Sequence, residues 1–206
     1  DLRAAKLTRE RAVASVVALL DTGAIRVGNE CYARDNKSFG ATTLRHRHAR
    51  IEGCKLRLRF KGKSGKPQDI TCSDAALLRC VRRMQDLPGQ HLFQYIDEDG
   101  AATPVSSDEV NAYLRETMGE DFTARNFRTF AASALAFGLL ARTPGLPLRA
   151  MLDSVSERLG NTPAIARKSY IHPAVMAAAK GEQAFVALIP DPLPRRTQWL
   201  TREERG

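Results

Sequence analysis

The chain has few cysteines, and their arrangement suits neither a disulfide framework nor a zinc site. Cys31, Cys54, Cys72 and Cys80 are widely and irregularly spaced, without a Cys-x-x-Cys pair or a Cys/His cluster. We interpret them as reduced, partly buried small hydrophobic residues, and we expect no metal site.

The sequence also lacks a signal peptide and any apolar run of membrane-spanning length. A cytoplasmic location without a membrane partner is the simplest expectation. Because the chain begins at Asp1 rather than at a methionine, we expect it to be a fragment or a processed product.

Three common catalytic or nucleotide-binding patterns are missing as well. Gly62-Lys63-Ser64 would need a glycine at position 57 to form a P-loop, and Arg57 stands there. The pair Asp97 and Asp99 lies in an Asp-Gly turn, which favours a solvated turn over a two-metal site. No Ser/His/Asp or Cys/His set stands out, so no cofactor is expected.

Acidic residues are outnumbered by basic ones. The 206 residues include 32 Lys and Arg against 23 Asp and Glu, which gives a formal net charge of +9. This excess favours a polyanionic partner, of which nucleic acid is the commonest, although a generically basic soluble protein remains the alternative. The length allows one sizeable core, or one domain with a small appendage.

Apolar periodicity predicts a mainly α fold with one small antiparallel sheet, an α+β arrangement. Capping residues and breakers place helices at residues 8–21, 28–32, 73–87 and 106–118, from Thr123, up to Arg158, from Pro163, and from Pro173 to about Ala187. Thr8 and Thr162 are the expected N-caps, Ser106 and Glu109 form a capping-box pattern, and His172 is expected to shape the junction before Pro173.

Alternation of apolar and basic residues over 54–60, resumed over 68–72, predicts a β-hairpin. The turn residues Gly62 to Gly65 place Lys63 at or beside its tip. A further short strand is expected over 91–95.

Tyr170 is the residue of greatest chemical interest. A tyrosine hydroxyl has an ordinary pKa near 10 and is a poor nucleophile at neutral pH. Cations around a phosphate would stabilise the charge that builds during attack. If a helix begins at Pro163, Tyr170 lies roughly two turns along it, and Asn161 lies at its anion-favouring N-terminus.

Four segments in series resemble the type IB DNA topoisomerases, with the closest likeness to the small bacterial and poxvirus-like branch. The segments are 25–30, 60–64, 125–130 and 160–170. Each is a weak signal alone, but together they follow the order of the family and span most of the chain. The resemblance implies the DNA breaking–rejoining fold shared with tyrosine recombinases.

The resemblance also implies catalytic roles. Arg26 and Arg128 are the phosphate-clamping arginines, Lys63 protonates the departing 5′ oxygen, and Tyr170 is the nucleophile. Asn161 stands where poxviral and eukaryotic members have a histidine, and an amide still donates a hydrogen bond but brings no charge.

A second set of residues is expected to contact DNA rather than to take part in the chemistry. Arg125 is a supporting cation, and the polar, basic stretch that follows residue 41 is suited to phosphates or to a groove. The expected DNA contacts are Arg125, Thr43, Arg45, Arg47 and Lys61.

The implied function is relaxation of supercoiled double-stranded DNA through a transient 3′-phosphotyrosine, without ATP or metal, by a monomer associated with a bacterial nucleoid. Two alternatives remain. A tyrosine recombinase usually has a His-x-x-Arg box, where this chain has Arg125 and Arg128. A noncatalytic DNA-binding module is favoured only by Asn161.

For domain organisation, we expect a catalytic domain at 1–189 and a Pro/Arg-rich tail at 190–206. The N-terminal DNA-clamp domain of the family is expected to be absent, and DNA binding to be correspondingly weaker than that of a whole enzyme.

Overall fold

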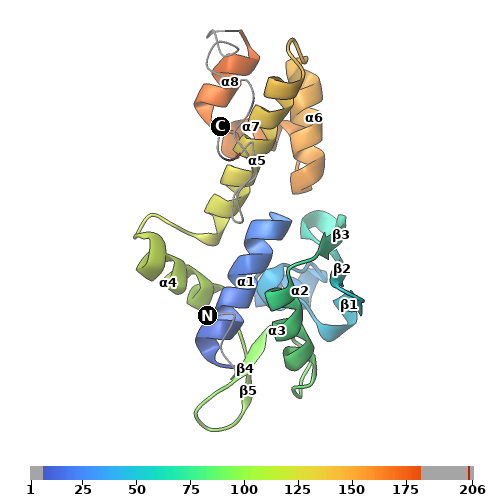
Figure 1. Ribbon diagram of the computed structural model, residues 1–206, viewed down its shortest axis with the longest axis vertical. Coiled ribbons are helices and arrows are strands. Elements are labelled where there is room, and N and C mark those ends of the chain that lie inside the picture. Colours follow the sequence, from blue (N-terminus) through green and yellow to red (C-terminus); the bar gives the residue numbers. More distant parts are fainter. Residues whose placement is uncertain (1–6, 182–203, 205–206) are drawn as a thin grey trace. The chain divides into compact units, whose positions relative to one another are not determined.

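The structure is a computed structural model that describes residues 7–181 and Glu204 (Figure 1). The chain divides into two compact units, Asp1–Phe127 and Arg128–Gly206, and the division falls inside helix α5 (Ala124–Arg142). Among the described residues, no helix combines the length and the apolar composition needed to cross a membrane.

The first unit combines helices with two small antiparallel sheets, which confirms the predicted fold class. Its elements before α5 are α1 (Arg9–Gly23), α2 (Glu30–Asn36), η1 (Ala41–Thr43), η2 (His46–His48), β1 (Ala49–Glu52), β2 (Lys55–Lys61), η3 (Lys63–Gly65), β3 (Pro67–Cys72), α3 (Ala75–Gln85), β4 (Gln94–Ile96), β5 (Ala102–Pro104) and α4 (Ser107–Met118). Thr8 caps helix α1, because its side chain accepts from the N–H of Arg11. Helix α4 begins at the predicted capping box of Ser106 and Glu109.

The larger sheet has the order β1-β2-β3, with both pairs antiparallel. In the central strand β2, the buried Leu56, Leu58 and Phe60 alternate with basic residues on the outer face. Pairing of β2 with β3 continues to Lys61 opposite Pro67, which confirms the predicted hairpin and places Lys63 in the turn. Strand β1 was not predicted.

The core of the first unit brings together side chains from α1, β2, α3, α4 and the segment before β4. Leu20, Leu58, Met84, Phe93 and Leu114 are all at most 1% exposed. Burial of such a side chain contributes about 1.5–3 kcal/mol relative to exposure. This core fixes the hairpin and the loops on which the first-unit candidate residues lie.

The second unit is helical. After α5 it contains α6 (Leu148–Leu159), α7 (Pro163–Ser169) and α8 (Pro173–Ala179). Four of its residues are buried: Leu159 at the end of α6, Ala166 within α7, Ile171 between α7 and α8, and Met176 within α8. Helix α8 begins where the His172 side chain accepts from the N–H of Ala174, so His172 shapes this junction as expected.

The predicted starts of α2 and of β4 were wrong. Helix α2 begins at Glu30 rather than at Gly28, because Gly28 has φ = 104° and the Asn29 side chain caps the helix. The strand expected over 91–95 begins only at Gln94, although His91 forms an isolated bridge with Arg45.

At the other end of the chain, α8 ends at Ala179, earlier than predicted. Residues 182–187 of the expected helix lie outside the described residues, and so does the tail at 190–206 except Glu204.

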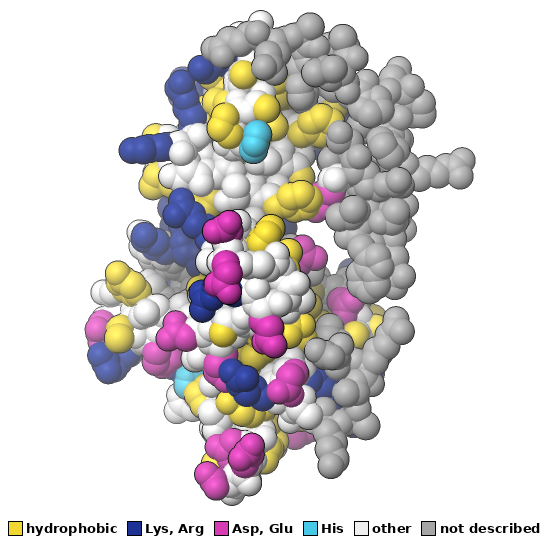
Figure 2. Space-filling view, turned by 90° about the vertical axis from the view of Figure 1, so that its left-hand side faces the viewer, with side chains coloured by type: hydrophobic (Ala, Val, Ile, Leu, Met, Phe, Trp, Pro, Cys, Tyr) yellow, Lys and Arg dark blue, Asp and Glu magenta, His cyan; other side chains and the backbone are white. Residues whose placement is uncertain are grey.

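The β4–β5 turn is acidic and folds through Asp97. Its carboxylate accepts from the N–H of Ala101 at 2.8 Å and from the hydroxyl of Thr103 at 2.7 Å. Figure 2 shows acidic side chains gathered at the lower end of this face, where Figure 1 places the turn. The Asp97–Asp99 pair therefore lies in a turn, as the sequence predicts, and the Asp97 carboxylate is hydrogen-bonded within that turn.

Candidate active site

Arg128 is the centre of the candidate site in the second unit. It lies in α5 and is only 3% exposed. Its Nη2 donates to the carbonyl oxygen of Leu159 at 2.9 Å and to Oδ1 of Asn161 at 3.4 Å. Its guanidinium carbon lies 5.1 Å from the centre of the Tyr170 ring, within cation–π range. One buried cation thus contacts both Asn161 and Tyr170.

The link between α6 and α7 explains why these groups meet. Gly160 ends α6 in the left-handed conformation at φ = 63°, and the N–H of Asn161 donates to the carbonyl of Ser156 at 2.9 Å. Thr162 then caps α7 by accepting from the N–H of Ile165, with Pro163 at the first helical position. This reversal turns the Leu159 carbonyl and the Asn161 amide toward the same guanidinium.

Tyr170 lies just past the end of α7. The helix begins at Pro163, as predicted, but it ends at Ser169, and Tyr170 is the C-cap residue with φ = −131°. Its N–H still donates to the carbonyl of Ala166 at 3.1 Å. The backbone therefore leaves the helix at the candidate nucleophile, whose side chain remains partly exposed.

Ser133 is a positioning residue that the sequence reasoning missed. Its Oγ accepts from the N–H of His172 at 2.9 Å and lies 3.3 Å from the carbonyl oxygen of Tyr170. It is five positions after Arg128 in α5, so the same helix contacts both the ring of Tyr170 and its backbone. A serine inside an apolar helix gives no sequence signal of such a role.

Arg26 lies in the first unit, between α1 and α2, with its side chain partly buried. Its carbonyl oxygen accepts from the N–H of Ala41 at 2.9 Å, and that of Val27 accepts from the N–H of Thr42 at 2.7 Å. Gly28 and Gly40 pass close to each other, since a Cβ built on Gly40 would lie 2.6 Å from the Gly28 nitrogen. The loop that follows α2 therefore holds the backbone of Arg26 in one position.

Lys63 also lies in the first unit, in the turn between β2 and β3. The N–H of Gly62 donates to the carbonyl of Lys66 at 2.7 Å, and the N–H of Gly65 donates to that of Gly62 at 3.1 Å. Ser64 has the left-handed φ of 60°, which closes the turn. The Lys63 side chain is exposed at this tip.

The five expected DNA contacts have different environments. Arg125, Arg47 and Lys61 are exposed. Thr43 is only 2% exposed, and its hydroxyl accepts from the N–H of Gly40 at 2.9 Å, so it holds the loop next to Arg26. Arg45 is mostly buried against other side chains.

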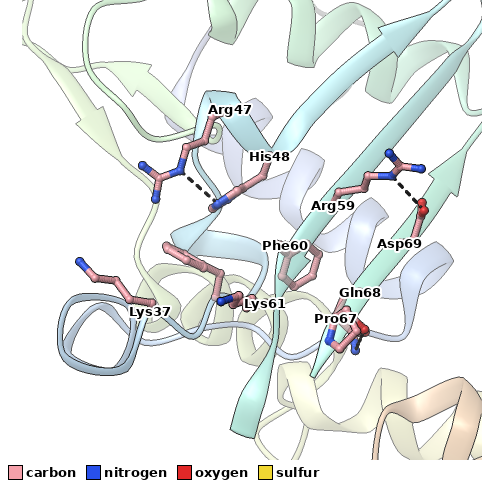
Figure 3. Close-up of a pocket in the computed structure, with 10 residues that line it drawn as sticks. Lys37, Arg47, His48, Arg59, Phe60, Lys61, Pro67, Gln68 and Asp69 are labelled. Atoms are coloured by element: carbon pink, nitrogen blue, oxygen red, sulfur yellow. Dashed lines mark hydrogen bonds and ion pairs between the residues drawn. The ribbon is translucent and has the colours of Figure 1, made fainter. Parts of the chain in front are cut away.

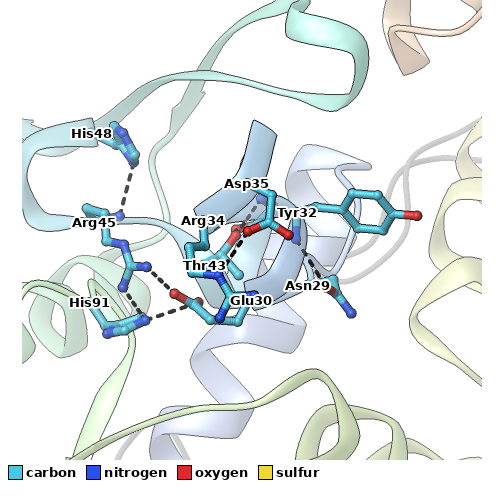
Figure 4. A network of polar contacts seen from close by, with 10 residues as sticks. Asn29, Glu30, Tyr32, Arg34, Asp35, Thr43, Arg45, His48 and His91 are labelled. Atoms are coloured by element: carbon cyan, nitrogen blue, oxygen red, sulfur yellow. Dashed lines mark hydrogen bonds and ion pairs between the residues drawn. The ribbon is translucent and has the colours of Figure 1, made fainter. Parts of the chain in front are cut away.

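Arg45 belongs to a network with Glu30 and His91 (Figure 4). The guanidinium donates to the carboxylate of Glu30 and contacts the ring of His91, whose Nε2 lies 3.3 Å from Glu30. Burial alone would raise the pKa of Glu30, but the hydrogen bonds from Arg45 and His91 outweigh it and hold that pKa below its ordinary value. Figure 4 shows the Tyr32 ring pointing away from this network.

The structure thus brings together three of the five predicted catalytic residues, namely Arg128, Asn161 and Tyr170. The other two, Arg26 and Lys63, belong to the first unit. Each is held by a short, well-bonded loop.

Comparison with known protein families identifies the family of this chain. The model of the catalytic core of eukaryotic DNA topoisomerase I matches residues 1–182, most of the chain. The chain belongs to the type IB DNA topoisomerase family.

Two curated topoisomerases are similar to this family member. The DNA topoisomerase 1B of Acanthamoeba polyphaga mimivirus is 34% identical over 178 residues, which cover 79% of this chain and 53% of that protein. The DNA topoisomerase 1 of Mycosarcoma maydis is 26% identical over 156 residues, which cover 67% of this chain and 15% of that protein. The chain therefore spans about half the length of the first relative and much less of the second.

A solved structure has a similar backbone. The XerH site-specific recombinase, in a post-cleavage complex with a palindromic difH substrate, aligns with a TM-score of 0.50 and 17% identity. The alignment covers 86% of this chain and 45% of that one. At this identity the likeness concerns the fold alone, and it agrees with the predicted breaking–rejoining fold.

In this type IB topoisomerase family member, the cluster of Arg128, Asn161 and Tyr170 in the second unit has the groups needed to act on a phosphate. A buried arginine is always protonated and offers several donors to an anion. An amide beside it adds a donor without charge, and a tyrosine hydroxyl is the one nucleophile in the cluster. These groups are suited to hold a phosphodiester and to attack it.

Proposed function

We propose that this chain relaxes supercoiled duplex DNA by cutting and resealing one strand. The observation that carries the proposal is the contact of the buried Arg128 with both Asn161 and Tyr170, in a chain of the type IB topoisomerase family. The net charge of +9 supports a duplex DNA partner.

In the proposed reaction, the Tyr170 hydroxyl oxygen attacks the phosphorus of a backbone phosphodiester and releases its proton to water. A phosphorus–oxygen bond to tyrosine forms, and the bond to the 5′ oxygen breaks. The 5′ oxygen takes a proton from Lys63, which leaves a 3′-phosphotyrosine and a free 5′ hydroxyl. The broken strand rotates, and the reverse transfer reseals it.

The remaining catalytic residues act on the nonbridging oxygens. Arg26 and Arg128 engage them with planar, permanently charged guanidinium groups, and Asn161 donates one further hydrogen bond. Because the phosphodiester is exchanged for a phosphotyrosine ester, its energy is retained. The proposed reaction therefore needs no ATP. Because Arg26, Arg128 and Asn161 stabilise the charge on the phosphoryl oxygens and Lys63 supplies the proton, we propose that it needs no metal ion either.

The proposal extends to the setting of the enzyme. We propose a monomer that acts on duplex DNA in the cytoplasm, in association with a bacterial nucleoid, without a nucleotide cofactor. Arg125, Arg47 and Lys61 are the exposed cations proposed to track the DNA backbone.

The test is relaxation of negatively supercoiled plasmid in EDTA and without ATP. The unchanged chain is expected to relax the plasmid, and Tyr170→Phe, which removes only the hydroxyl, is expected to abolish relaxation. Equal relaxation by both proteins would refute the assignment of Tyr170. Exchange between two specific sites, without relaxation of an arbitrary plasmid, would favour a recombinase instead.

A further inference from the structure

A groove beside the hairpin takes no part in the chemistry described above. It has a volume of about 600 Å³ and lies wholly in the first unit, between the segment after α2, η2 and the β2–β3 hairpin (Figure 3). Besides Arg59, which is paired with Asp69, three exposed cations line it: Lys37, Arg47 and Lys61. Each comes from a different segment, so the charge is gathered by the fold and not by a run in the sequence.

Backbone contacts hold the segments that bear Lys37 and Lys61. The N–H of Phe39 donates to the carbonyl of Lys61 at 2.8 Å, which joins the segment after α2 to the end of β2. Lys37 is the C-cap of α2 in the left-handed conformation, at φ = 51°. Glycine adopts this conformation at a lower energetic cost, so Lys37 has a backbone conformation that lysine disfavours.

Uncharged rings also line the groove. The rings of Phe39 and His48 meet edge to face, with centroids 4.4 Å apart, and Phe60 lies 6.4 Å from His48. Burial, followed by the charges of Arg47 and Arg45, lowers the pKa of His48 to about 4. The ring is therefore neutral at neutral pH, and the Arg47 guanidinium lies 5.9 Å from the Phe39 centroid.

Asp69 is the one acidic side chain among the described residues that line the groove, and its charge is already engaged. Arg57 donates to it at 2.7 and 2.9 Å, and Arg59 donates at 3.0 Å. Within the described part of the chain, no ion pair involves any of the three lining cations Lys37, Arg47 and Lys61. The groove thus has an uncompensated positive charge.

We propose that this groove binds the sugar–phosphate backbone of one DNA strand beside the cleavage point, and this inference rests on the proposed function. Phosphates lie against Lys37, Arg47 and Lys61, and the apolar face of a deoxyribose lies on Phe39. The combination of cations with an aromatic surface suits a nucleotide chain better than a lone inorganic anion, which would leave the rings unused.

The position of the groove along the hairpin supports this occupant. Lys61 ends β2 and lies two residues before Lys63, the proposed acid. Two residues of extended chain span about 7 Å at most, which is the axial rise of about two nucleotides of B-DNA. A strand whose scissile phosphate reaches Lys63 therefore has neighbouring phosphates within reach of the groove.

The test is the salt dependence of binding to a fluorescently labelled duplex, measured by anisotropy. Each lost phosphate contact makes the slope of log K against log salt shallower by about 0.9. The triple variant Lys37→Gln, Arg47→Gln and Lys61→Gln is therefore expected to have a slope that is shallower by about 2.7. Phe39→Leu is expected to weaken binding severalfold with the slope unchanged.

The matched control removes the same charge elsewhere, through Lys55→Gln, Arg79→Gln and Arg115→Gln, which are exposed and outside the groove. If the control triple variant keeps the slope of the unchanged chain, while the groove variant is shallower, the groove proposal is supported. Equal slopes for the two triple variants would overturn it. Because all six side chains are exposed, folding is expected to survive and is checked by circular dichroism.

The same proteins separate this inference from the proposed function. A covalent adduct that depends on Tyr170, together with equal slopes for the two triple variants, means that the groove proposal fails while the catalytic one stands. If the groove variant has a shallower slope but the unchanged chain forms no such adduct, the groove proposal stands and the catalytic one fails.

Discussion

At the scale of single residues, the site depends on how Arg128 is held. Among the described residues, the Leu159 carbonyl, Oδ1 of Asn161 and the face of Tyr170 contact its guanidinium. Truncating one neighbour leaves the other two. Asn161 therefore is the position at which a hydrogen bond to phosphate can be removed with the clamping arginine still in place.

Asn161→Ala is expected to lower the single-turnover cleavage rate about 10²- to 10³-fold, the usual effect of removing one donor to a transition-state oxygen. DNA affinity is expected to change little, since no charge is lost. The measurement is adduct formation on a nicked duplex under single-turnover conditions.

Asn161→His is the matched comparison, because it restores an N–H donor at the same place. It is expected to retain most of the cleavage rate of the unchanged chain. An alanine variant as fast as the unchanged chain would mean that Asn161 makes no contact with the reacting phosphate.

At the scale of elements, short loops position the catalytic side chains of the first unit. A Cβ on Gly40 would lie 2.6 Å from the carbonyl oxygen of Arg26 and from Cα of Gly28. Contacts this short, with backbone atoms on both sides, cannot be relieved by a side-chain rotation. A side chain at this position must move the segment that bears Arg26.

Gly40→Ala is therefore expected to reduce the cleavage rate strongly and to lower the melting temperature. Gly23→Ala is the control, because a Cβ there would meet side-chain carbons at 3.5 and 3.7 Å, an ordinary contact distance. The two variants are compared by adduct formation and by thermal denaturation. Full activity in Gly40→Ala would show that the loop does not set the position of Arg26.

The hairpin that bears Lys63 is braced across its outer face by Asp69. The hydrogen bond from Arg57, with a further one from Arg59, lowers the pKa of Asp69 to about 2, against an opposing effect of burial. Because the pKa in the folded state is depressed, this stabilisation is complete above the ordinary pKa of 3.8 and is lost as the pH falls toward 2.

A carboxyl titration by NMR is expected to give Asp69 a midpoint near 2 in the unchanged chain. In Arg57→Gln the midpoint is expected to rise toward 3.8, because the bidentate donor is lost. Arg50→Gln, an exposed residue of β1, serves as the control and is expected to leave the midpoint unchanged. A midpoint near 3.8 in the unchanged chain would contradict the brace.

At the scale of the whole molecule, the sequence predicts the features that depend on residues close together in the chain, such as helix caps and turns. The caps at Thr8 and Thr162, the Ser106–Glu109 box and the hairpin turn at Lys63 all follow from side chains a few residues apart, and all are confirmed. Four segments in series were sufficient to indicate the family.

Long-range contacts were not predictable in this way. Strand β1 has four residues with only Ala49 buried, so its pattern is too short to recognise. The pairing of Arg45 with Glu30 and His91 joins residues up to 61 positions apart, and it engages a cation expected to contact DNA. The role of Ser133 likewise depends on a contact with residues near position 170.

The central claim is that Tyr170 becomes covalently joined to the 3′ end of a cut DNA strand. The most direct measurement is trapping of that adduct on a nicked suicide duplex, with peptide mapping of the modified residue. We predict a 3′-phosphotyrosine on Tyr170, a free 5′ hydroxyl on the released strand, and no adduct in Tyr170→Phe. An adduct on another residue, a 5′ linkage, or an adduct that persists in Tyr170→Phe would contradict it.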